Sequence, residues 1–548
     1  MTADPRGDDW IGVFVDGYSI TETAPVKFYT LADAGPSHLE SGSGSVALTL
    51  LNLRAPQRVV AFRGGLESPV AVASSTPVSF AHVDEPTGIH LLLGPGGSVR
   101  VQWTTAHSAS PAVRFVRDGG VRDGGGADWS ESPAEDDTYG RGDMCPGDDA
   151  TSRGFLDPGV LHTATMAGLE PGAVYRYRVG DAGLEGAPWS AELAFTAPPR
   201  VGPAEEVRIV ALADNGTDEA DGSSQSKGWD HYFRGSLAVS EAVLAEWAGG
   251  PPGLVVMNGD ISYGMGFTYT WERWLAQMAV PLTSAPWLTA PGNHEADGPR
   301  EGILFHGPDS GGECGVPYAK RLPMPYGPPG GLAGPSRPPS RKLAGPRGVP
   351  PAPVWYGVDF GPIHFTQMST EHPFEPGSPQ HAFLAADLAA VDRCRTPWVV
   401  LGGHRPFYVD SDNASPGNGD QPVSRMLNES IGPLLRDNGV DMTWTGHHHS
   451  YQRTCPVVDG ACADGGTVHV VMGHAGAALC TNVLPETPDV FEKVYLGFGW
   501  TVVEAGTEGG EHWLRLTSYG VGEGGGRGEV VDEVVLRRAV DAGCLGAA

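Results

Sequence analysis

Five short apolar runs in the chain each lead into residues that can bind metal ions. The segments at their ends are Asp214-Asn-Gly216, Gly259-Asp260-Ile-Ser-Tyr263, Gly292-Asn293-His294-Glu295, Gly402-Gly-His404 and Gly446-His447-His448-His449. A glycine in each set lets the backbone turn sharply after the run. In open α/β sheets, ligands bind in the crevice at the carboxyl ends of the strands. A single aspartate there is more often a helix cap, and a lone histidine is more often structural, but five such ends predict one shared site.

The types of these residues indicate which metals the site would bind. Asp, Tyr, Asn and His offer oxygen and nitrogen donors, and no thiolate is among them. A phenolate at Tyr263 favours a trivalent ion, whose charge keeps the phenol deprotonated below its ordinary pKa of about 10. The neutral amide of Asn293 and the imidazoles suit a divalent ion, and the two oxygens of Asp260 could bridge both ions. Two ions roughly 3.5–4 Å apart can stabilise the attacking and leaving oxygens of a phosphoryl displacement.

The elements that would position these residues alternate between strand and helix from residue 207 onwards. Strands are predicted at 207–213, 254–257, 287–290, 398–401 and 442–444, and helices at 236–247, 269–278, 380–391 and 423–436. A hairpin is predicted at 354–368, and four strands at 467–472, 500–504, 511–517 and 530–536. Two such halves predict an α/β fold, a four-layer sandwich with two mixed sheets between layers of helices. The Trp271, Trp274 and Met278 stripe is predicted to be core.

A chain of 548 residues is too long for one hydrophobic core. Residues 1–86 and 87–200 each contain short β-rich runs between turns, which predicts two β-sandwich domains of the immunoglobulin or fibronectin type. The runs lie at 10–15, 46–51, 58–62, 70–73, 98–105 and 174–179, and 118–154 is expected to be a long loop. Residues 201–548 would form the catalytic domain. Within it, 326–353 is rich in Pro and Gly and is predicted to be a disordered insertion.

Charge excludes several classes of partner. The chain has 36 basic and 65 acidic residues, a formal net charge of −29, which argues against binding to nucleic acid or to an anionic membrane. No apolar run approaches the roughly 18–20 residues of a membrane span. The N-terminus lacks an apolar signal-peptide core, so either the chain is not exported or the sequence lacks its export segment.

Seven cysteines are spread along the chain, and none forms a Cys-x-x-Cys pair, which argues against a zinc ribbon. Cys455 and Cys462 flank a short turn and could close a small disulfide loop. The odd number leaves at least one thiol unpaired or intermolecular. Asn413-Ala-Ser and Asn428-Glu-Ser fit the glycosylation pattern, which often matches by chance. Asn215-Gly-Thr fits it too but falls in the predicted metal loop.

The metal-binding segments, in this order, resemble those of the purple acid phosphatases within the metallophosphoesterase superfamily. Four further segments resemble the large plant and algal type: Asp9-Asp-Trp-Ile-Gly-Val-Phe, Asp143-Met-Cys145, Asp309-Ser-Gly-Gly-Glu-Cys314-Gly-Val-Pro and Arg453-Thr-Cys455-Pro-Val. The resemblance implies an Fe(3+) ion held by Asp214, Tyr263 and His449, with Asp260 bridging. It implies a divalent ion, Zn, Mn or Fe, held by Asn293, His404 and His447.

The resemblance also implies a reaction. A metal-bound hydroxide would attack phosphorus, and His294 would bind the substrate or protonate the leaving oxygen. His448 is expected to point away from the metals, because neighbouring strand-like positions face opposite ways. The smaller plant enzymes have further histidines about ten residues after the equivalent of His404, where this chain has Asp410, Asp412 and Asn413.

Substrate binding is therefore expected to use Asn293 and His294 together with replacements for those histidines. Arg405, His372 and Tyr408 are the candidates, and for each of them a structural role is equally compatible with the sequence. The leading expectation is an acid phosphatase that hydrolyses phosphate monoesters of small phosphorylated substrates. The alternatives are a nucleotide pyrophosphatase or phosphodiesterase using the same site, a relative with two divalent ions and no colour, and a catalytically inert cell-wall or surface-binding protein. The resemblance implies a secreted, cell-wall or vacuolar location.

Overall fold

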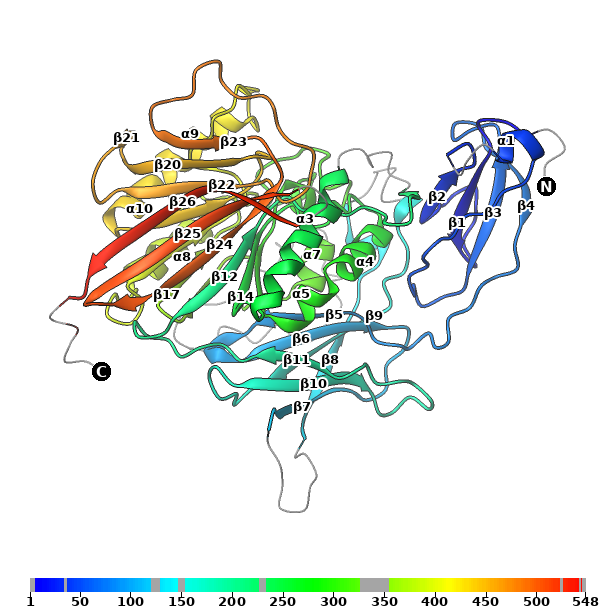
Figure 1. The fold of residues 1–548 in the computed structure, drawn as a ribbon, viewed down its shortest axis with the longest axis horizontal. Coiled ribbons are helices and arrows are strands. Elements are labelled where there is room, and N and C mark those ends of the chain that lie inside the picture. Colours follow the sequence, from blue (N-terminus) through cyan, green and yellow to red (C-terminus); the bar gives the residue numbers. More distant parts are fainter. Residues whose placement is uncertain are drawn as a thin grey trace.

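The computed structural model describes residues 5–33, 37–119, 129–145, 153–225, 233–325, 354–522, 526–541 and 544. The predicted insertion at 326–353 lies outside these residues. The strands of the described part form three sheets, of five, thirteen and eight strands. Figure 1 shows the first sheet set to one side of a larger body that contains the other two. In that described part, no helix has the length and apolar character needed to cross a membrane.

The first sheet has the order β13-β2-β1-β3-β4. Its elements are β1 (Trp10–Val15), β2 (Lys27–Thr30), β3 (Gln57–Arg63), β4 (Val70–Ser74) and β13 (Ser224–Gln225), with helix α1 (Ser37–Ser41) beside them. Trp10 and Phe62 stack on one face with ring centroids 4.2 Å apart, which suits the preference of aromatic rings for packed pairs. Because β13 pairs with β2, a segment of the catalytic part of the chain completes the N-terminal sheet.

The strand predicted at 46–51 is wrong. This segment lies outside any sheet, although Leu48 and Leu50 pack against the core cluster that contains Val13 and Leu53. The main-chain amide of Thr49 donates to the carboxylate of Asp221 at 2.7 Å instead of to a neighbouring strand. Alternating apolar and polar residues therefore indicate that every second side chain is buried, but they do not show that the segment pairs with another strand.

The second domain is a sandwich whose two faces are joined by one bent strand. Its strands are β5 (Thr87–Leu93), β6 (Val99–Thr105), β7 (Pro111–Arg117), β8 (Ser130–Asp137), β9 (Val160–Met166), β10 (Val174–Asp181) and β11 (Leu193–Thr196). The first half of β8 pairs with β7, and its second half pairs with β9. The faces enclose a core that includes Trp103, Phe115 and Tyr177. The prediction of a long loop over 118–154 is therefore wrong, because it contains β8.

The thirteen-stranded sheet runs from this sandwich into the catalytic domain. The catalytic strands are β12 (Val207–Leu212), β14 (Leu254–Asn258), β15 (Trp287–Ala290), β24 (Gly499–Glu508), β25 (Glu511–Val521) and β26 (Arg527–Ala539). The join is a parallel pairing of β15 with β5 at Trp287 and Leu92. The helices of this half are α3 (Arg234–Ala245), α4 (Thr268–Gln277), α5 (Ala279–Ser284), α6 (Asn293–Ala296) and α7 (Val316–Arg321).

The second catalytic sheet has the order β16-β17-β18-β19-β22-β20-β21, and β23 also pairs with β20. Its strands are β16 (Tyr356–Phe360), β17 (Ile363–Gln367), β18 (Trp398–Gly402), β19 (Met442–Thr445), β20 (Tyr451–Val458), β21 (Ala461–Cys462), β22 (Thr467–Met472) and β23 (Phe491–Tyr495). Its helices are α8 (Pro379–Ala389), α9 (Asp420–Ser430) and α10 (Gly432–Asp437). The predicted helix over 423–436 is divided in two at Ile431, just before Gly432 and Pro433, which interrupt helices.

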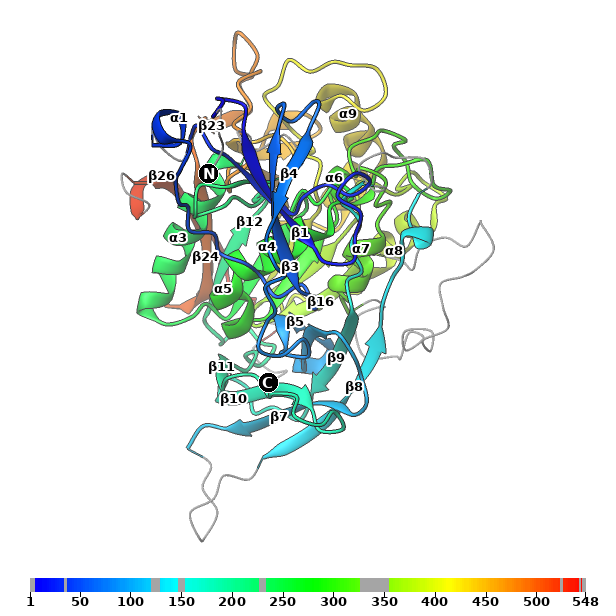
Figure 2. The same ribbon diagram turned by 90° about the vertical axis from the view of Figure 1, so that its right-hand side faces the viewer.

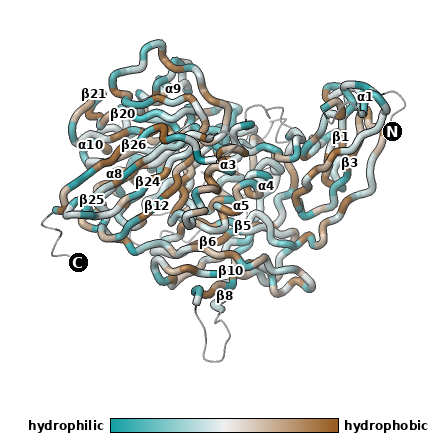
Figure 3. Tube along the Cα trace, in the orientation of Figure 1, coloured by the Kyte–Doolittle hydropathy of each residue, from teal (hydrophilic) through white to brown (hydrophobic). Residues whose placement is uncertain are grey.

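Strand β18 shows how the layers are built. Val400 faces the core shared by both catalytic sheets, whereas Val399 and Leu401 face a second core formed with α8, α9 and α10. Strands buried on both faces need apolar side chains at every position, which explains why these runs are continuously apolar. Figure 3 shows hydrophobic residues along the central strands. Two sheets with helices outside them give the predicted four-layer α/β sandwich, and the Trp271, Trp274 and Met278 stripe lies in its core as predicted.

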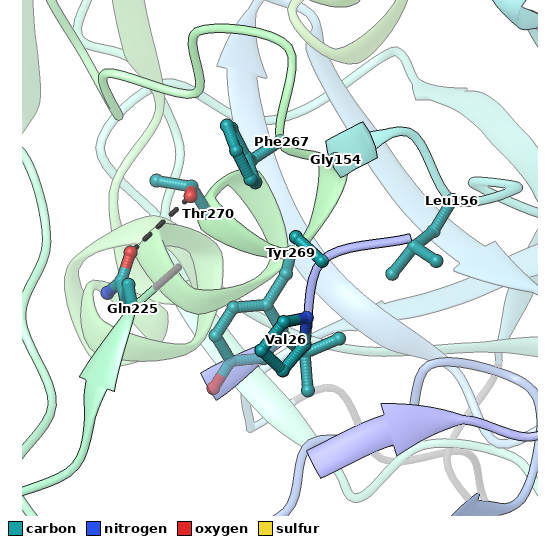
Figure 4. Close-up of a pocket in the computed structure, with 9 residues that line it drawn as sticks. Val26, Gly154, Leu156, Gln225, Phe267, Tyr269 and Thr270 are labelled. Atoms are coloured by element: carbon teal, nitrogen blue, oxygen red, sulfur yellow. Dashed lines mark hydrogen bonds between the residues drawn. The ribbon is translucent and has the colours of Figure 1, made fainter. Parts of the chain in front are cut away.

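The N-terminal domain contacts the catalytic domain through buried ions. Lys27 Nζ lies 3.2 Å from Glu219 and 2.6 Å from Asp221, and Tyr269 donates to Glu219 at 2.7 Å. Beside them, a cavity of about 10 Å³ lies between Val26 and Tyr269, no larger than the space of one water molecule (Figure 4). Turned by 90°, the N-terminal sheet lies in front of α4 (Figure 2). Arg273 Nε, 3.5 Å from Glu219, adds a second positive charge to this packed junction.

Three disulfides lie in the described chain, two between distant segments and one across a short loop. They join Cys145 to Cys314, Cys394 to Cys544 and Cys455 to Cys462, and the thiol of Cys480 is free. The small loop predicted between Cys455 and Cys462 is confirmed. The Cys145–Cys314 bond ties the segment between β8 and β9 to the loop before α7, a loop that reaches the functional site.

His364 at the start of the second sheet makes stability depend on pH. Burial by itself lowers the pKa of His364, but its bonds to Asp359 at 2.7 Å and Asp387 at 3.1 Å raise the pKa to about 9. A raised pKa stabilises the fold fully below the unfolded value of about 6.5, and this contribution is lost as pH rises through about 9. We expect the free energy of unfolding to fall by up to ~3 kcal/mol over that interval.

Denaturant midpoints at pH 6 and pH 9 measure this contribution, and His364→Gln should flatten the difference between them. His107→Gln, which changes a histidine whose side chain is 67% exposed, is the matched control. An equal pH dependence in the parent protein and His364→Gln would contradict this assignment.

Candidate metal centre

The predicted ligands come from both catalytic sheets and meet where those sheets face each other. Asp214 follows β12, Asp260 follows β14, and Asn293 begins α6 just after β15. His404 follows β18 in the other sheet, and His447 and His449 follow β19. Strand pairing fixes this convergence, because β12, β14 and β15 are parallel neighbours, as are β18 and β19. The carboxyl ends of the two sets therefore supply one site.

Two groups of three potential ligands share a single carboxylate. In one, Asp260, His404 and His447 each offer an atom within 4.8 Å of the other two, and in the other, Asp214, Asp260 and His449 do so. Asp260 Oδ2 lies 3.4 Å from His404 Nε2, and Asp214 Oδ1 lies 3.4 Å from His449 Nε2. Because Asp260 belongs to both groups, the geometry suits two ions with a bridging carboxylate.

Tyr263 and Asn293 complete the two groups, one on each side. The hydroxyl oxygen of Tyr263 lies 3.2 Å from Asp214 Oδ1 and 2.9 Å from His449 Nε2. Asn293 Oδ1 lies 2.9 Å from His404 Nε2 and 3.0 Å from His447 Nδ1. All seven predicted ligands are thus brought together, a phenol on one side and a neutral amide on the other. The donor set fits a pair of different ions.

The backbone that presents these ligands is strained. Asp214, Asp260, Tyr263 and His447 all have positive φ angles, between 49° and 71°, in the left-handed region that non-glycine residues seldom occupy. Such conformations cost about 1–3 kcal/mol each and persist at functional sites when surrounding contacts enforce them. Here one enforcing contact is the carboxylate of Glu295, which accepts from the main-chain amides of Asp260 and Ile261 at 2.8 Å and Gly292 at 2.9 Å.

Two glycines are required by close approach. A Cβ atom at Gly292 would overlap Asp260 Oδ1 and lie 2.9 Å from His404 Nε2. A Cβ atom at Gly446 would overlap Asp214 Oδ2. The glycines in the sequence segments therefore make room for the ligand atoms as well as permitting turns.

Each histidine of the site has its second ring nitrogen occupied. His404 Nδ1 lies 2.9 Å from the carbonyl oxygen of Asn258, and His449 Nδ1 lies 2.6 Å from that of Ala478. His447 is turned the other way, with Nε2 at 3.4 Å from Asp420 Oδ1. In a neutral ring, a nitrogen that donates to an acceptor leaves the other nitrogen unprotonated and facing the site, as metal ligation requires.

Burial and mutual charge set the protonation of the ligands in the absence of ions. Burial by itself raises the pKa of Asp260, but the charges of His404 and His294 lower it well below its usual range. Burial by itself lowers the pKa of His404, and Asp260 more than reverses this, raising it to about 10. Burial and the charge of Asp214 raise the pKa of Tyr263 well above its ordinary value. Tyr263 is therefore a neutral phenol until a cation displaces its proton.

His294 lies on the open side of the site. Its side chain is 19% exposed. Among the seven predicted metal ligands, His447 and His449 are 15% and 16% exposed, and the remaining five are almost fully buried. His294 Nδ1 lies 2.9 Å from the carbonyl oxygen of Asp309, which leaves Nε2 facing the ligand cluster, 3.8 Å from Asp260 Oδ2. A substrate approaching the cluster from solvent would meet this nitrogen.

The proposed replacements for the missing histidines lie away from the open side. Arg405 is buried, with Nε 3.0 Å from both oxygens of Glu371 and Nη2 3.4 Å from Asp297. His372 is also buried, with Nδ1 2.7 Å from Ser369 Oγ, and burial lowers its pKa to about 4. The use of Arg405 and His372 in substrate binding stays a prediction.

Tyr408, the third candidate for substrate binding, and His448 also lie outside the ligand cluster. Tyr408 packs against His469, with ring centroids 4.6 Å apart. His448 Nδ1 lies 2.8 Å from Ser450 Oγ, behind the ligands, as expected. The glycosylation pattern at Asn428 falls on a half-buried asparagine whose amide donates to the carbonyl oxygens of Phe407 and Ser424.

Sequence reasoning missed two carboxylates that contact the ligands. Asp309 Oδ2 accepts from Asn293 Nδ2 at 3.0 Å, and Asp420 contacts His447. Asp309 lies in a loop 16 residues after Asn293, and Asp420 lies at the start of α9. In the sequence, the Asp309-Ser-Gly-Gly-Glu-Cys314 segment is marked only by its family resemblance, and no motif marks Asp420.

Comparison with known proteins agrees with the geometry. Residues 1–82 match the Fn3-like domain from purple acid phosphatase, residues 86–197 match the purple acid phosphatase N-terminal domain, and residues 207–451 match the calcineurin-like phosphoesterase family. The chain is 32% identical over 532 residues to "Probable inactive purple acid phosphatase 27" of Arabidopsis thaliana, which covers 90% of this chain and 80% of the relative. It is 31% identical over 312 residues to "Nucleotide pyrophosphatase/phosphodiesterase" of Hordeum vulgare, covering 54% of this chain and 77% of the relative.

A solved structure extends the likeness to almost the whole chain. The structure of purple acid phosphatase PPD1 from yellow lupin (Lupinus luteus) seeds superposes with a TM-score of 0.83 at 28% sequence identity. The match covers 98% of this chain and 91% of the lupin chain. Three successive family matches, the long alignment and the common architecture lead to one conclusion: the chain belongs to the purple acid phosphatase family.

Proposed function

We propose that this protein is an acid phosphatase that hydrolyses phosphate monoesters at a two-metal centre. The observation that carries the proposal is the sharing of Asp260 by two groups of ligands from two different sheets. A structural metal site would be closed by four ligands around one ion. A shared carboxylate with three partly exposed histidines beside it instead leaves space for a substrate.

The ligand types favour different ions in the two halves. Asp214, Tyr263 and His449 would hold Fe(3+), and Asn293, His404 and His447 would hold Zn, Mn or Fe as a divalent ion, with Asp260 between them. Bound ions would supply an activated water molecule and would neutralise charge on the phosphoryl oxygens. The free phenol of Tyr263 has a high pKa, so the charge of a trivalent ion would be needed to make it a ligand.

The chain's own residues would bind the substrate and supply a proton. His294 is held through Nδ1 by the carbonyl oxygen of Asp309, so Nε2 points at the cluster from the solvent side. A protonated Nε2 there can bond to a phosphoryl oxygen and pass its proton to the leaving oxygen as the P–O bond breaks. Such general acid catalysis typically contributes about 10²–10⁴-fold.

Two alternatives have a specific basis. The barley relative is named a nucleotide pyrophosphatase/phosphodiesterase, which makes phosphodiesters and pyrophosphates the alternative substrates to test. Several Arabidopsis relatives carry names that include "inactive". In this chain all seven predicted ligands are present and lie together, which favours an active centre. Assays of the metal-loaded protein with a phosphomonoester and with a bis-nitrophenyl diester separate the three outcomes.

Three disulfides and the plant relatives support a secretory location. Disulfides persist in oxidising compartments and are rare in the cytosol. We propose that the protein acts outside the cytosol, at the cell surface, in the wall or in the vacuole.

Tyr263→Phe tests the identity of the trivalent ion. If Tyr263 binds Fe(3+), the parent protein has a charge-transfer band in the visible spectrum, and Tyr263→Phe removes the band without unfolding the protein. Tyr269→Phe, which changes a buried tyrosine bonded to Glu219 away from the centre, should keep the band. A colourless parent protein that still hydrolyses phosphate esters would contradict the iron assignment.

A further inference from the structure

We propose that Asp309 and Asp420 are positioning residues that prepare the divalent half of the centre, whereas main-chain groups contact His449 and Asp214 in the trivalent half. The inference rests on the proposed metal centre. It concerns how two ligands, Asn293 and His447, are held in the one orientation that can bind an ion.

Asp309 fixes which end of the Asn293 side chain faces the site. An amide can point either its oxygen or its nitrogen at a neighbour, and only the oxygen can bind a cation. Asp309 Oδ2 accepts from Asn293 Nδ2 at 3.0 Å, so Oδ1 must face His404 and His447. The reversed amide would place its oxygen against a carboxylate, which is repulsive.

Asp420 decides which nitrogen of His447 carries the proton. Two groups compete for His447 Nε2: Asp420 Oδ1 at 3.4 Å and Arg405 Nη1 at 3.3 Å. If Arg405 donates to Nε2, the proton of the neutral ring must sit on Nδ1, which then cannot bind an ion. If Nε2 donates to Asp420, then Nδ1 is free to face the site. A carboxylate at this position is what makes the ligand-competent tautomer favourable.

Both carboxylates are themselves held in place. Ser411 and Asn413 bond to the Asp420 carboxylate, and Asp420 is buried at the start of α9. The loop of Asp309 is held by the Cys145–Cys314 disulfide and by Ser310, whose hydroxyl donates to the carbonyl oxygen of Asp297. Arg405, the competitor, has its charge balanced by Glu371 and Asp297.

The trivalent half is arranged differently. His449 Nδ1 lies against the main-chain carbonyl of Ala478, and Asp214 Oδ2 accepts from the main-chain amide of His447 at 2.9 Å. Main-chain partners cannot be removed by a side-chain substitution. Loss of Asp309 or Asp420 should therefore weaken divalent binding while leaving iron bound.

The experiment compares zinc binding to iron-loaded protein for the parent, Asp309→Ala, Asp309→Asn, Asp420→Ala and Asp420→Asn. Iron and zinc are counted by elemental analysis, zinc affinity is measured by titration with Zn²⁺ alone, and the visible band reports bound iron. Glu301→Ala and Asp412→Ala each remove an exposed carboxylate from one of the same two loops and serve as controls. We expect Asp309→Ala and Asp420→Ala each to bind zinc about 10–100-fold more weakly than the parent protein.

The asparagine variants distinguish orientation from charge. Asparagine keeps an oxygen acceptor but lacks the negative charge, so zinc affinity closer to the parent than in the alanine variants supports positioning. The inference is overturned if the alanine variants bind zinc like the controls, if they lose iron in parallel with zinc, or if the asparagine and alanine variants are equally weak. A parent protein that cannot bind iron and zinc together defeats the proposed metal centre, and the inference with it. A parent that binds both but hydrolyses nothing defeats only the proposed activity.

Discussion

Asp260→Ala is expected to reduce hydrolysis by about 10³-fold or more, the order of loss seen when a group that stabilises charge at a reacting centre is removed. Asp260 is the residue that the two potential metal groups of the described chain share, so its removal disrupts both halves of the centre at once. It is buried, and its Oδ1 also accepts from the main-chain amide of His294 at 3.0 Å. The substitution therefore removes a shared ligand and loosens the proton donor.

Turnover of a phosphomonoester and the number of bound ions per chain measure this loss. Asp412→Ala is the control, because it removes an exposed carboxylate near the site without removing a ligand. Unchanged turnover in Asp260→Ala, with the parent active, would show that the reaction takes place elsewhere.

Gly292→Ala is expected to lower activity by about 10²-fold or more through steric displacement alone. The φ angle of Gly292 is −103°, which alanine adopts without strain, so the added methyl group is the whole perturbation. That methyl would overlap Asp260 Oδ1 and crowd His404 Nε2, which forces two ligands of the centre apart. A displacement of about 1 Å at a reacting site can reduce the rate by about 10².

Gly307→Ala is the matched control for this steric effect. A Cβ atom at Gly307 would come no closer than 3.5 Å to Asp297 Oδ2, an ordinary contact distance. Activity and bound metal are measured for both variants, and thermal unfolding shows whether each is folded. If Gly292→Ala kept full activity and both ions, the close approach between Gly292 and the ligands would have no functional meaning.

The sequence was most informative about the doubly buried strands. Runs such as 254–257 and 398–401 are apolar at every position, because both faces of their sheets are covered, and this pattern predicts buried strands. Strand β8 was missed because its sequence, Ser-Glu-Ser-Pro-Ala-Glu-Asp-Asp, is acidic and contains a proline. It has no buried face of its own and exists because β7 and β9 supply partners on successive halves.

The ligands of the centre were predictable because each follows an apolar strand and a sharp turn. What the sequence could not reveal were the interactions that orient them. Asp309 and Asp420 become visible only when the chain brings them beside Asn293 and His447. Arg405 shows a related difficulty: a basic residue next to a ligand suggests substrate binding, and the sequence does not show that two buried carboxylates lie against its guanidinium. Its use in substrate binding stays a prediction. Local sequence carries residue type and spacing, and it does not carry partners from distant segments.

Because β15 pairs with β5, the domain limits given by the family matches do not coincide with the limits of the unit expected to fold cooperatively. Without residues 87–200, the edge of β15 would have unpaired main-chain groups, and α5, which contacts β5 and β11, would lose much of its support. Tyr177 of the sandwich also donates to the carbonyl oxygen of Thr283 in α5 at 2.7 Å. The sandwich of residues 87–200 therefore supports the catalytic domain directly, and we expect the two to unfold as one cooperative unit.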